Sequence, residues 1–178
     1  MSARAFIAVG SNLDAERNVA TALELLGHLV RVAAVSSFYR TPALGAPGSP
    51  SFLNGVIEIE TELEPRELKR LVLLEVENKL GRERGDDPNA PRSIDLDLVL
   101  YGNLVCSEEE LALPAPEILE RAFVALPLLE LEPELVLPGT DHQPLLGLAA
   151  GLSSSEMVPA ESFNTRLRRA ERTGRENE

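Results

Sequence analysis

The chain has 178 residues, of which 44% are hydrophobic, and we expect them to form one globular domain with its own core. Its 29 acidic residues outnumber the 17 basic ones, and the formal net charge of -12 argues against a broad surface for binding DNA or RNA. One cysteine cannot form an internal disulfide, and two histidines offer no zinc-ligand spacing.

The sequence shows neither a long apolar run nor a basic start followed by an apolar segment. Such runs mark membrane spans and secretory signals, respectively. We therefore expect a cytoplasmic protein with no membrane partner and no nucleic-acid partner.

The first third of the chain alternates between strand and helix signals. ARAFIAVGSN ends an apolar run at Gly10, Ser11 and Asn12, which predicts a buried strand. Apolar residues at helical spacing predict a helix over about 14–30. VRVAAVSSFYR predicts a further strand that stops at Thr41-Pro42, before the Gly- and Pro-rich loop LGAPGSPS.

The middle of the chain repeats the pattern. FLNGVIEIET predicts a strand over 52–61, and Glu64-Pro65 predicts the start of a helix over about 65–80 that Gly81 closes. After the loop RERGDDPNAP comes PRSIDLDLVLYG, a strand that carries two aspartates.

The last third mixes short helices with prolines, including one helix near 144–152. We place a single domain at 1–152 and a polar tail at 153–178, and we interpret the arginine-rich tail as a solvated or frayed end. The element order predicts an α+β fold with a ferredoxin-like βαββαβ core. Additional C-terminal helices would cover the second face of its sheet.

Several common nucleotide and hydrolase motifs are missing. There is no GxxxxGK[ST] loop, no GxG spacing and no GxSxG elbow. These absences do not exclude a catalytic triad assembled from residues that are distant in sequence.

The two aspartates are the most informative feature. Asp95 and Asp97 lie two apart on the predicted strand, so both point to one face about 6.6 Å apart. Ile94, Leu96, Leu98 and Leu100 would anchor the other face in the core. The carboxylate pair suits Mg²⁺, although a solvated edge strand with solubilising charges also explains it. Arg82, Arg84 and Arg92 bracket the preceding loop, and arginines beside metal-binding carboxylates are typical of phosphoryl transfer.

Three other residues each allow a functional and a structural interpretation. Glu77 precedes Gly81 by one turn, close in sequence to the arginines, and a solvated helix charge is the favoured interpretation from the residues alone. Phe52 and Asn54 share a strand face and could stack on and hydrogen-bond a flat heterocycle, whereas a core phenylalanine and a turn asparagine account for them as well.

The sequence also resembles a known family, the hydroxymethyl-dihydropterin pyrophosphokinases. The resemblance covers about positions 5–150 and rests on motifs in the family's order and spacing. These are GSN, SSFYRTPALG, FLNGV, LGRER, PRSIDLDLVLYG and LERAFVALPLLELEPELVLPG.

The resemblance implies a monomeric, three-layer αβα enzyme of folate biosynthesis. Such an enzyme moves pyrophosphate from ATP to the hydroxymethyl group of 6-hydroxymethyl-7,8-dihydropterin and releases AMP. It implies that Asp95 and Asp97 bind Mg²⁺, expected as two ions although their spacing also suits one shared ion, and that these aspartates act in catalysis with Arg82 and Arg92. Loops 44–51 and 82–91 would close over the substrates.

Two further residue sets follow from the resemblance. The ATP site would comprise Glu77, Arg84, Arg92, Leu98 and Arg121. The pterin pocket would comprise Thr41, Pro42, Leu44, Phe52, Asn54 and Phe123.

The chain departs from the family pattern at two places on the ATP side. Asn89 stands where many members carry an aromatic residue, and Ala115 stands where many carry histidine. Two rival hypotheses remain: a ferredoxin-like binding or regulatory module without catalysis, and an enzyme that transfers another group from ATP to another alcohol.

Overall fold

The computed structural model describes residues 2–43, 48–82 and 90–175, without the side chains of 171–175. These residues form a six-stranded sheet whose pairs are all antiparallel. Its strands are β1 (Ala3–Ser11), β2 (Arg31–Val35), β3 (Tyr39–Thr41), β4 (Phe52–Thr61), β5 (Asp95–Tyr101) and β8 (Val158–Pro159).

The strand order is β5-β1-β4-β3-β8, and β2 also pairs with β4. The fourth strand of the predicted motif thus lies beside the first, and the third lies between the first and second. This is the ferredoxin-like arrangement, so the predicted fold is confirmed.

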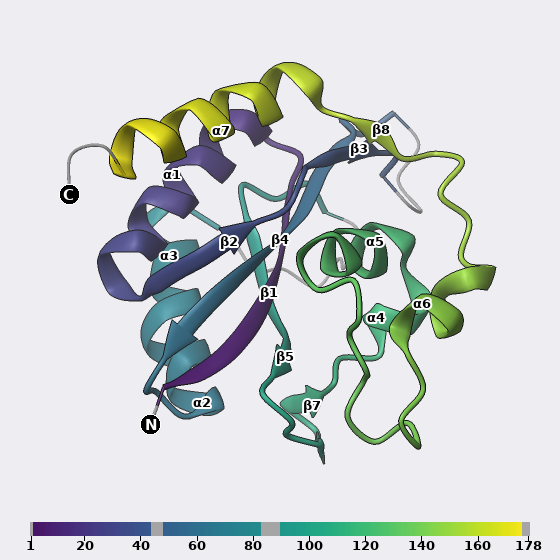
Figure 1. Ribbon diagram of the computed structural model, residues 1–178. Coiled ribbons are helices and arrows are strands. Elements are labelled where there is room, and N and C mark those ends of the chain that lie inside the picture. Colours follow the sequence, from purple (N-terminus) through teal and green to yellow (C-terminus); the bar gives the residue numbers. More distant parts are fainter. Residues whose placement is uncertain (1, 44–47, 83–89, 176–178) are drawn as a thin grey trace.

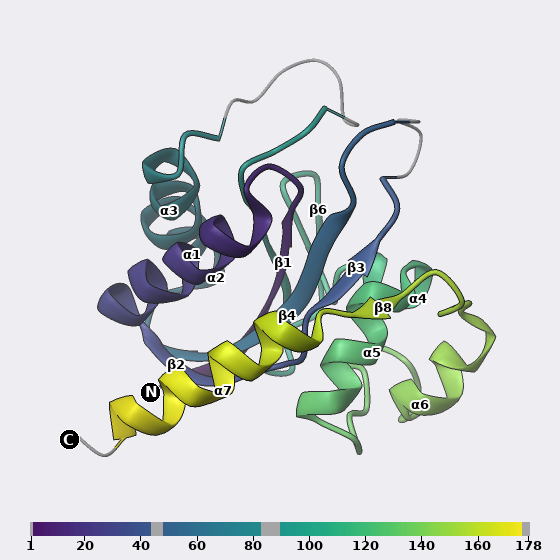
Figure 2. The ribbon, with the colours of Figure 1, turned by 90° about the horizontal axis from the view of Figure 1, so that it is seen from above.

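Helices cover both faces of the sheet (Figures 1 and 2). On one face lie α1 (Ala15–Leu29), α7 (Glu161–Arg175) and a continuous helical segment. That segment runs through α2 (Pro65–Leu68), a π-helical turn (Lys69–Leu73) and α3 (Leu74–Lys79). The other face carries α4 (Glu117–Glu120), α5 (Ala122–Leu131) and α6 (Leu145–Leu148), which continues as a 3₁₀ turn (Ala149–Gly151). A hairpin of β6 (Cys106–Glu108) and β7 (Leu111–Leu113) follows β5.

The predicted local signals explain where these helices form. Val19, Ala22 and Leu26 recur at helical spacing on α1, and all three are buried against the sheet. The α2 segment begins with a first-turn proline, Pro65, and a capping box in which Glu64 and Glu67 satisfy each other's backbone donors.

The sheet separates two hydrophobic cores. The first joins the α1, α3 and α7 face to side chains such as Ile57 and Ile94. The second joins the α4–α6 face to side chains such as Val56 and Val99. Consecutive residues of β4 therefore enter opposite cores, as the alternation of a strand requires.

The prediction that Leu100 shares a face with Ile94, Leu96 and Leu98 was wrong. Leu98 pairs with Ile7 and Leu100 with Phe6, so Val99 is an extra residue at a β-bulge. The bulge resets the alternation, and Leu100 lies in the second core whereas the other three lie in the first.

The predicted strand over 30–40 is interrupted at Ser36–Phe38. Phe38 is fully buried there, and a Cβ at Gly55 on the neighbouring strand would come within 2.8 Å of its ring. Gly55 thus provides the space that lets this aromatic side chain enter the core.

The expectation of a solvated or frayed C-terminal end was also wrong. β8 pairs with β3, and Phe163 of α7 is buried with its ring 5.5 Å from that of Phe38. The Asn164 side chain accepts from the Phe38 backbone nitrogen at 2.8 Å and donates to its oxygen at 3.0 Å. Ala160, Phe163 and Leu167 form an apolar stripe at helical spacing, which the polar composition of the segment concealed.

Candidate active site

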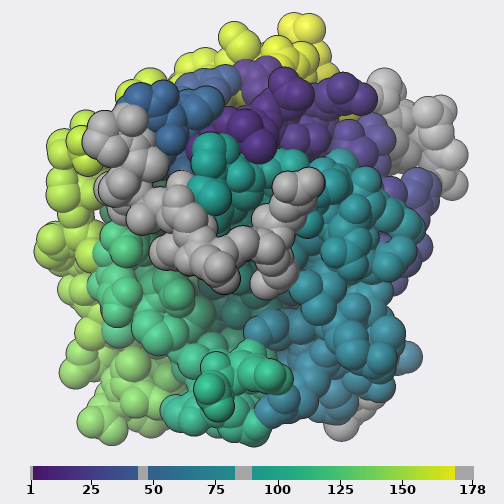
Figure 3. All heavy atoms as spheres, turned by 180° about the vertical axis from the view of Figure 1, so that it is seen from behind, coloured from purple at the N-terminus to yellow at the C-terminus, as the bar shows by residue number. Residues whose placement is uncertain are grey.

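A cavity of about 270 Å³ opens at one end of the sheet, between β5 and the start of α5. It collects residues that are far apart in sequence. Nine of the residues predicted for the site line this cavity: Thr41, Pro42, Phe52, Asn54, Arg92, Asp95, Asp97, Arg121 and Phe123. Figure 3 shows the molecule from behind, with α2–α3 in blue-teal on the right and α4–α5 in green on the left.

One part of the cavity combines aromatic and amide groups. The buried Asn54 donates from Nδ2 to Thr41 Oγ1 at 2.7 Å, which fixes the orientation of its amide. Gly10 lies opposite Asn54, and a Cβ there would stand 3.0 Å from Asn54 Oδ1. Phe52 and Phe123 contribute rings from β4 and α5. These groups suit a flat heterocycle with a polar edge.

The other part of the cavity carries the two aspartates. Their partners on β1 are Gly10 for Asp95 and Ala8 for Asp97, which are both small. The neighbouring strand therefore leaves space above the two carboxylates. The predicted convergence of Asp95 and Asp97 on one cavity is present.

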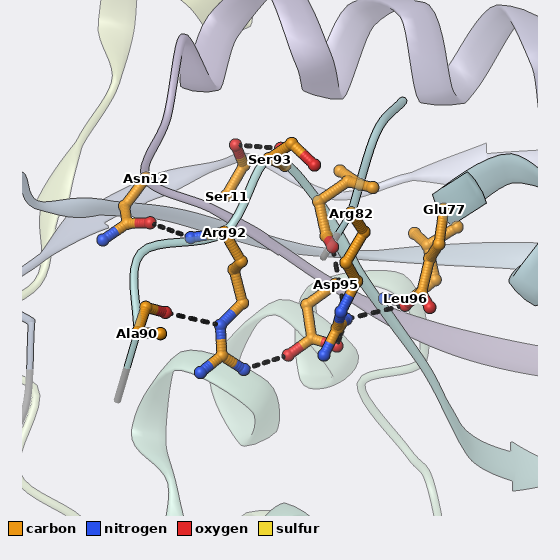
Figure 4. Close-up of polar contacts among 10 residues, drawn as sticks. Ser11, Asn12, Glu77, Arg82, Ala90, Arg92, Ser93, Asp95 and Leu96 are labelled. Atoms are coloured by element: carbon orange, nitrogen blue, oxygen red, sulfur yellow. Dashed lines mark hydrogen bonds and ion pairs between the residues drawn. The ribbon is translucent and has the colours of Figure 1, made fainter. Parts of the chain in front are cut away.

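Two arginines hold the Asp95 carboxylate (Figure 4). Arg92 donates from Nη1 to Asp95 Oδ2 at 2.7 Å, and Arg82 is ion-paired with Oδ1. The side chains of Arg82 and Asp95 are only 13% and 20% exposed, so water screens their pair weakly. Arg92 also lies over the Phe52 ring, with its guanidinium carbon 5.7 Å from the ring centre.

Glu77 is not the solvated helix charge of the alternative interpretation, since it is only 2% exposed. Its carboxylate accepts from Arg82 Nη1 at 2.8 Å and from the Leu96 backbone nitrogen at 2.9 Å. Glu77 thereby joins α3 to β5 and orients Arg82. It does not line the described cavity.

The carboxyl group of Asp97 has a pKa raised to about 7. Partial desolvation of this group disfavours its charged form, and the negative charges of Asp95 and Glu77 act in the same direction. Arg82 opposes the shift. Asp97 nevertheless stays accessible to solvent through the cavity.

The carboxylate pair fits a hard cation. Mg²⁺ prefers oxygen ligands and typically takes one or two protein carboxylates, with waters and substrate phosphates completing its shell. Among the described residues, no group of three or more His, Cys, Asp or Glu is placed to hold a metal ion. A cation shared between Asp95, Asp97 and phosphate would also relieve the repulsion that raises the pKa of Asp97.

Some predicted residues lie elsewhere. Leu98 is buried in the first core and lines no described cavity, which leaves only its backbone to contact a nucleotide. Leu44 and Arg84 lie outside the described residues, as does Asn89. Ala115 is buried in the second core.

A second cavity of about 720 Å³ lies against the helical segment α2–α3 and was not predicted. Its lining is mixed in charge: it comprises Arg66, Glu67, Lys69, Arg70, Leu73, Leu74, Leu96, Asp97 and Glu110. The basic residues recur at helical spacing, a signal that could have been read from the sequence. Among the described residues, Asp97 is the one that lines both cavities. Glu117 of α4 lines the first cavity and was also not predicted.

No described helix is both long and apolar enough to cross a membrane.

Comparison with known proteins places these residues in a family. Residues 6–133 match the family described as 7,8-dihydro-6-hydroxymethylpterin-pyrophosphokinase (HPPK). The 2-amino-4-hydroxy-6-hydroxymethyldihydropteridine pyrophosphokinase of Methylorubrum extorquens is 42% identical over 139 residues, which are 76% of this chain and 87% of that protein. The protein of the same name from Pseudomonas aeruginosa is 36% identical over 162 residues, covering 89% of this chain and 99% of its own.

Longer proteins match as well. Folic acid synthesis protein fol1 of Schizosaccharomyces pombe is 39% identical over 165 residues, which are 91% of this chain but 22% of that protein. A solved structure described as HPPK-DHPS in complex with substrates superposes with a TM-score of 0.62 at 13% identity. The match covers 87% of this chain and 44% of that chain, and it supports the fold alone. The chain belongs to the 7,8-dihydro-6-hydroxymethylpterin-pyrophosphokinase family.

Proposed function

We propose that this protein transfers pyrophosphate from ATP to the hydroxymethyl group of 6-hydroxymethyl-7,8-dihydropterin and releases AMP. Besides family membership, one observation carries the proposal: Asp97 lines both the aromatic-amide cavity and the second cavity against α2–α3. Two ligands bound in these cavities would meet at the carboxylate pair. A two-substrate transfer needs that arrangement.

The first cavity would hold the pterin. Phe52 and Phe123 would stack on the heterocycle, and Asn54, held by Thr41, would bond its polar edge. Pro42 lines the same cavity, and Leu44 stays a prediction for this pocket.

The second cavity would hold the nucleotide. Arg66, Lys69 and Arg70 line it beside Glu67 and Glu110, and these basic side chains would pair with phosphate oxygens. Arg92 and Arg121 line the first cavity, from which they would reach phosphates placed between the two cavities. Arg84 stays a prediction for the ATP site. Glu77 would act through Arg82 and Leu96 instead of touching ATP.

Asp95 and Asp97 would hold Mg²⁺, as one or two ions. When bound, Mg²⁺ supplies positive charge that neutralises phosphate oxygens and the carboxylates. Both oxygens of Asp95 are engaged by Arg82 and Arg92 in this structure. We infer that the two guanidinium groups leave Asp95 for the phosphates when nucleotide binds, because phosphate oxygens are equally good bidentate acceptors.

The transfer requires no protein nucleophile. The substrate hydroxyl attacks the β-phosphorus of ATP, so the chain must mainly align the two ligands and exclude water. Arg82 and Arg92 would stabilise the negative charge on the transferring group. A cytoplasmic monomer stays a prediction.

A product assay tests this function. The protein is incubated with ATP, Mg²⁺ and 6-hydroxymethyl-7,8-dihydropterin, and the nucleotide products are separated by chromatography. AMP is expected in amounts equal to the consumed pterin. ADP in place of AMP, or no turnover, would refute the proposal.

A further inference from the structure

Asn12 is a buried polar residue in the turn between β1 and α1, with an exposed fraction of only 3%. It does not line the cavities described above. Both polar atoms of its side chain are nevertheless used, and they bond two different segments of the chain.

The first segment is the one that leads into β5. Asn12 Oδ1 accepts from the Arg92 backbone nitrogen at 2.8 Å (Figure 4). The backbone nitrogens of Asn12 and Leu13 both donate to the Arg92 oxygen, at 3.2 and 3.3 Å. Ser11 Oγ donates to the Ser93 oxygen at 2.6 Å. The end of β1 thus fixes the backbone from which the Arg92 side chain extends.

The second segment is the one that leads into β4. Asn12 Nδ2 donates to the Pro50 oxygen at 3.2 Å. Pro50 stands two residues before Phe52, whose ring lies beneath the Arg92 guanidinium. One amide group therefore joins the backbones that carry Phe52 and Arg92.

These two side chains serve different ligands in the proposed function. Phe52 would stack on the heterocycle, and Arg92 would bind phosphate. We propose that Asn12 is a positioning residue that couples the binding of the two substrates. This inference rests on the proposed function. The physical reason is that a displacement of either segment would leave one polar atom of a buried amide without a partner. Each ligand therefore favours the arrangement that the other ligand needs.

Two substitutions of Asn12 distinguish its hydrogen bond with the Arg92 backbone nitrogen from its hydrogen bond with the Pro50 oxygen. Asn12→Asp keeps an acceptor for the Arg92 nitrogen but sets a carboxylate oxygen against the Pro50 oxygen, so it removes one link. Asn12→Ala removes both. Asn18→Ala is the matched control, because Asn18 lies on α1 and its Nδ2 donates to the Leu13 oxygen at 2.6 Å, within the neighbouring turn and not to the Arg92 or Pro50 backbone.

The readout is a coupling factor. The dissociation constant of the pterin is measured by calorimetry without nucleotide and with Mg²⁺ and a non-hydrolysable ATP analogue, and the two values are divided. Coupling between sites typically amounts to about 5- to 150-fold. We expect the wild type in this range, at least a ~5-fold loss in both Asn12 variants, and a change below ~2-fold in Asn18→Ala.

The outcomes separate the inference from the proposed function. An unfolding curve establishes which variants fold. If Asn12→Ala does not fold, the coupling factor of Asn12→Asp tests the inference. If the wild type forms AMP but its coupling factor is one, the inference is refuted and the proposed function stands. If the folded Asn12 variants keep the coupling factor of the wild type, the inference is likewise refuted and the proposed function stands. A wild type that forms no AMP refutes the proposed function, and the inference falls with it.

Discussion

Arg92 donates from Nη1 to Asp95 Oδ2 at 2.7 Å, and this pair lies where the proposed phosphate site meets the pterin pocket. With Arg82 on Oδ1, the carboxylate of a predicted metal ligand is engaged by two cations at once. In the proposed function, these two positive charges would move from the aspartate to phosphate oxygens. This arrangement keeps two arginines ordered near the reacting groups.

The first prediction concerns catalysis by Asp97. Asp97→Asn removes the charge that would hold the cation between the two cavities, so the rate of AMP formation should fall at least ~10²-fold, as losing a charge-stabilising group typically does. Glu120→Gln, an exposed change on α4, should leave the rate unchanged. Near-normal activity of the Asp97→Asn protein would refute the metal role.

The second prediction concerns stability and pH. The pKa of Asp97 is about 7 in the folded protein, against 3.8 for an ordinary aspartate, so the folded state binds this proton more tightly than the unfolded chain. Its contribution to stability is therefore present below pH 4 and is lost as pH rises to 7. Asp97→Asn should raise the melting temperature of the ligand-free protein at pH 8 relative to wild type, and much less at pH 4. An equal effect at both pH values would contradict this pKa shift.

The third prediction concerns Glu77. Glu77→Ala leaves the Leu96 N–H and the Arg82 guanidinium without this buried acceptor, which typically costs about 3–5 kcal/mol in the free energy of unfolding. Urea unfolding measures the loss. Glu75→Ala is the control, since Glu75 is half-exposed and pairs with Lys79 at 3.4 Å, and it should cost less than about 1 kcal/mol. Equal costs for the two variants would rule out the structural role of Glu77.

The fourth prediction concerns the C-terminal helix. Asn164→Ala removes both hydrogen bonds to the Phe38 backbone and should lower the free energy of unfolding by about 2–4 kcal/mol. Thr165→Ala, at an exposed position of the same helix, should cost under about 1 kcal/mol. If denaturant unfolding gives the same stability for both variants, α7 does not anchor the β3 region as described.

The fifth prediction concerns the space beside Asn54. Gly10→Ala would place a Cβ 3.0 Å from Asn54 Oδ1, so the amide must shift and the dissociation constant of the pterin should rise. In Gly27→Ala the added Cβ meets nothing within 4 Å, and that variant should bind the pterin normally. Calorimetry compares the two. Unchanged affinity in Gly10→Ala would argue against Asn54 as the group that meets the heterocycle.

Much of the fold could be predicted because its signals are local. The spacing of Val19, Ala22 and Leu26, and Pro65 at a helix start, are visible within a few residues of sequence. Asp95 and Asp97 converge on one cavity because strand alternation alone sets their direction.

The wrong predictions concern residues whose position depends on contacts with distant parts of the chain. The bulge at Val99 depends on the register with β1, so alternation misplaced Leu100. Glu77 is buried because a strand 19 residues later offers it the Leu96 N–H. The stripe that includes Phe163 was hidden by surrounding arginines, and only its contact with Phe38 shows that the segment belongs to the core.

The fate of the β-phosphorus of ATP tests the central claim most directly. ATP labelled at that position is incubated with the protein, Mg²⁺ and 6-hydroxymethyl-7,8-dihydropterin, and the labelled products are separated. We predict that the label moves to the pterin while unlabelled AMP is released. Label that remains in ADP would contradict pyrophosphate transfer at this site.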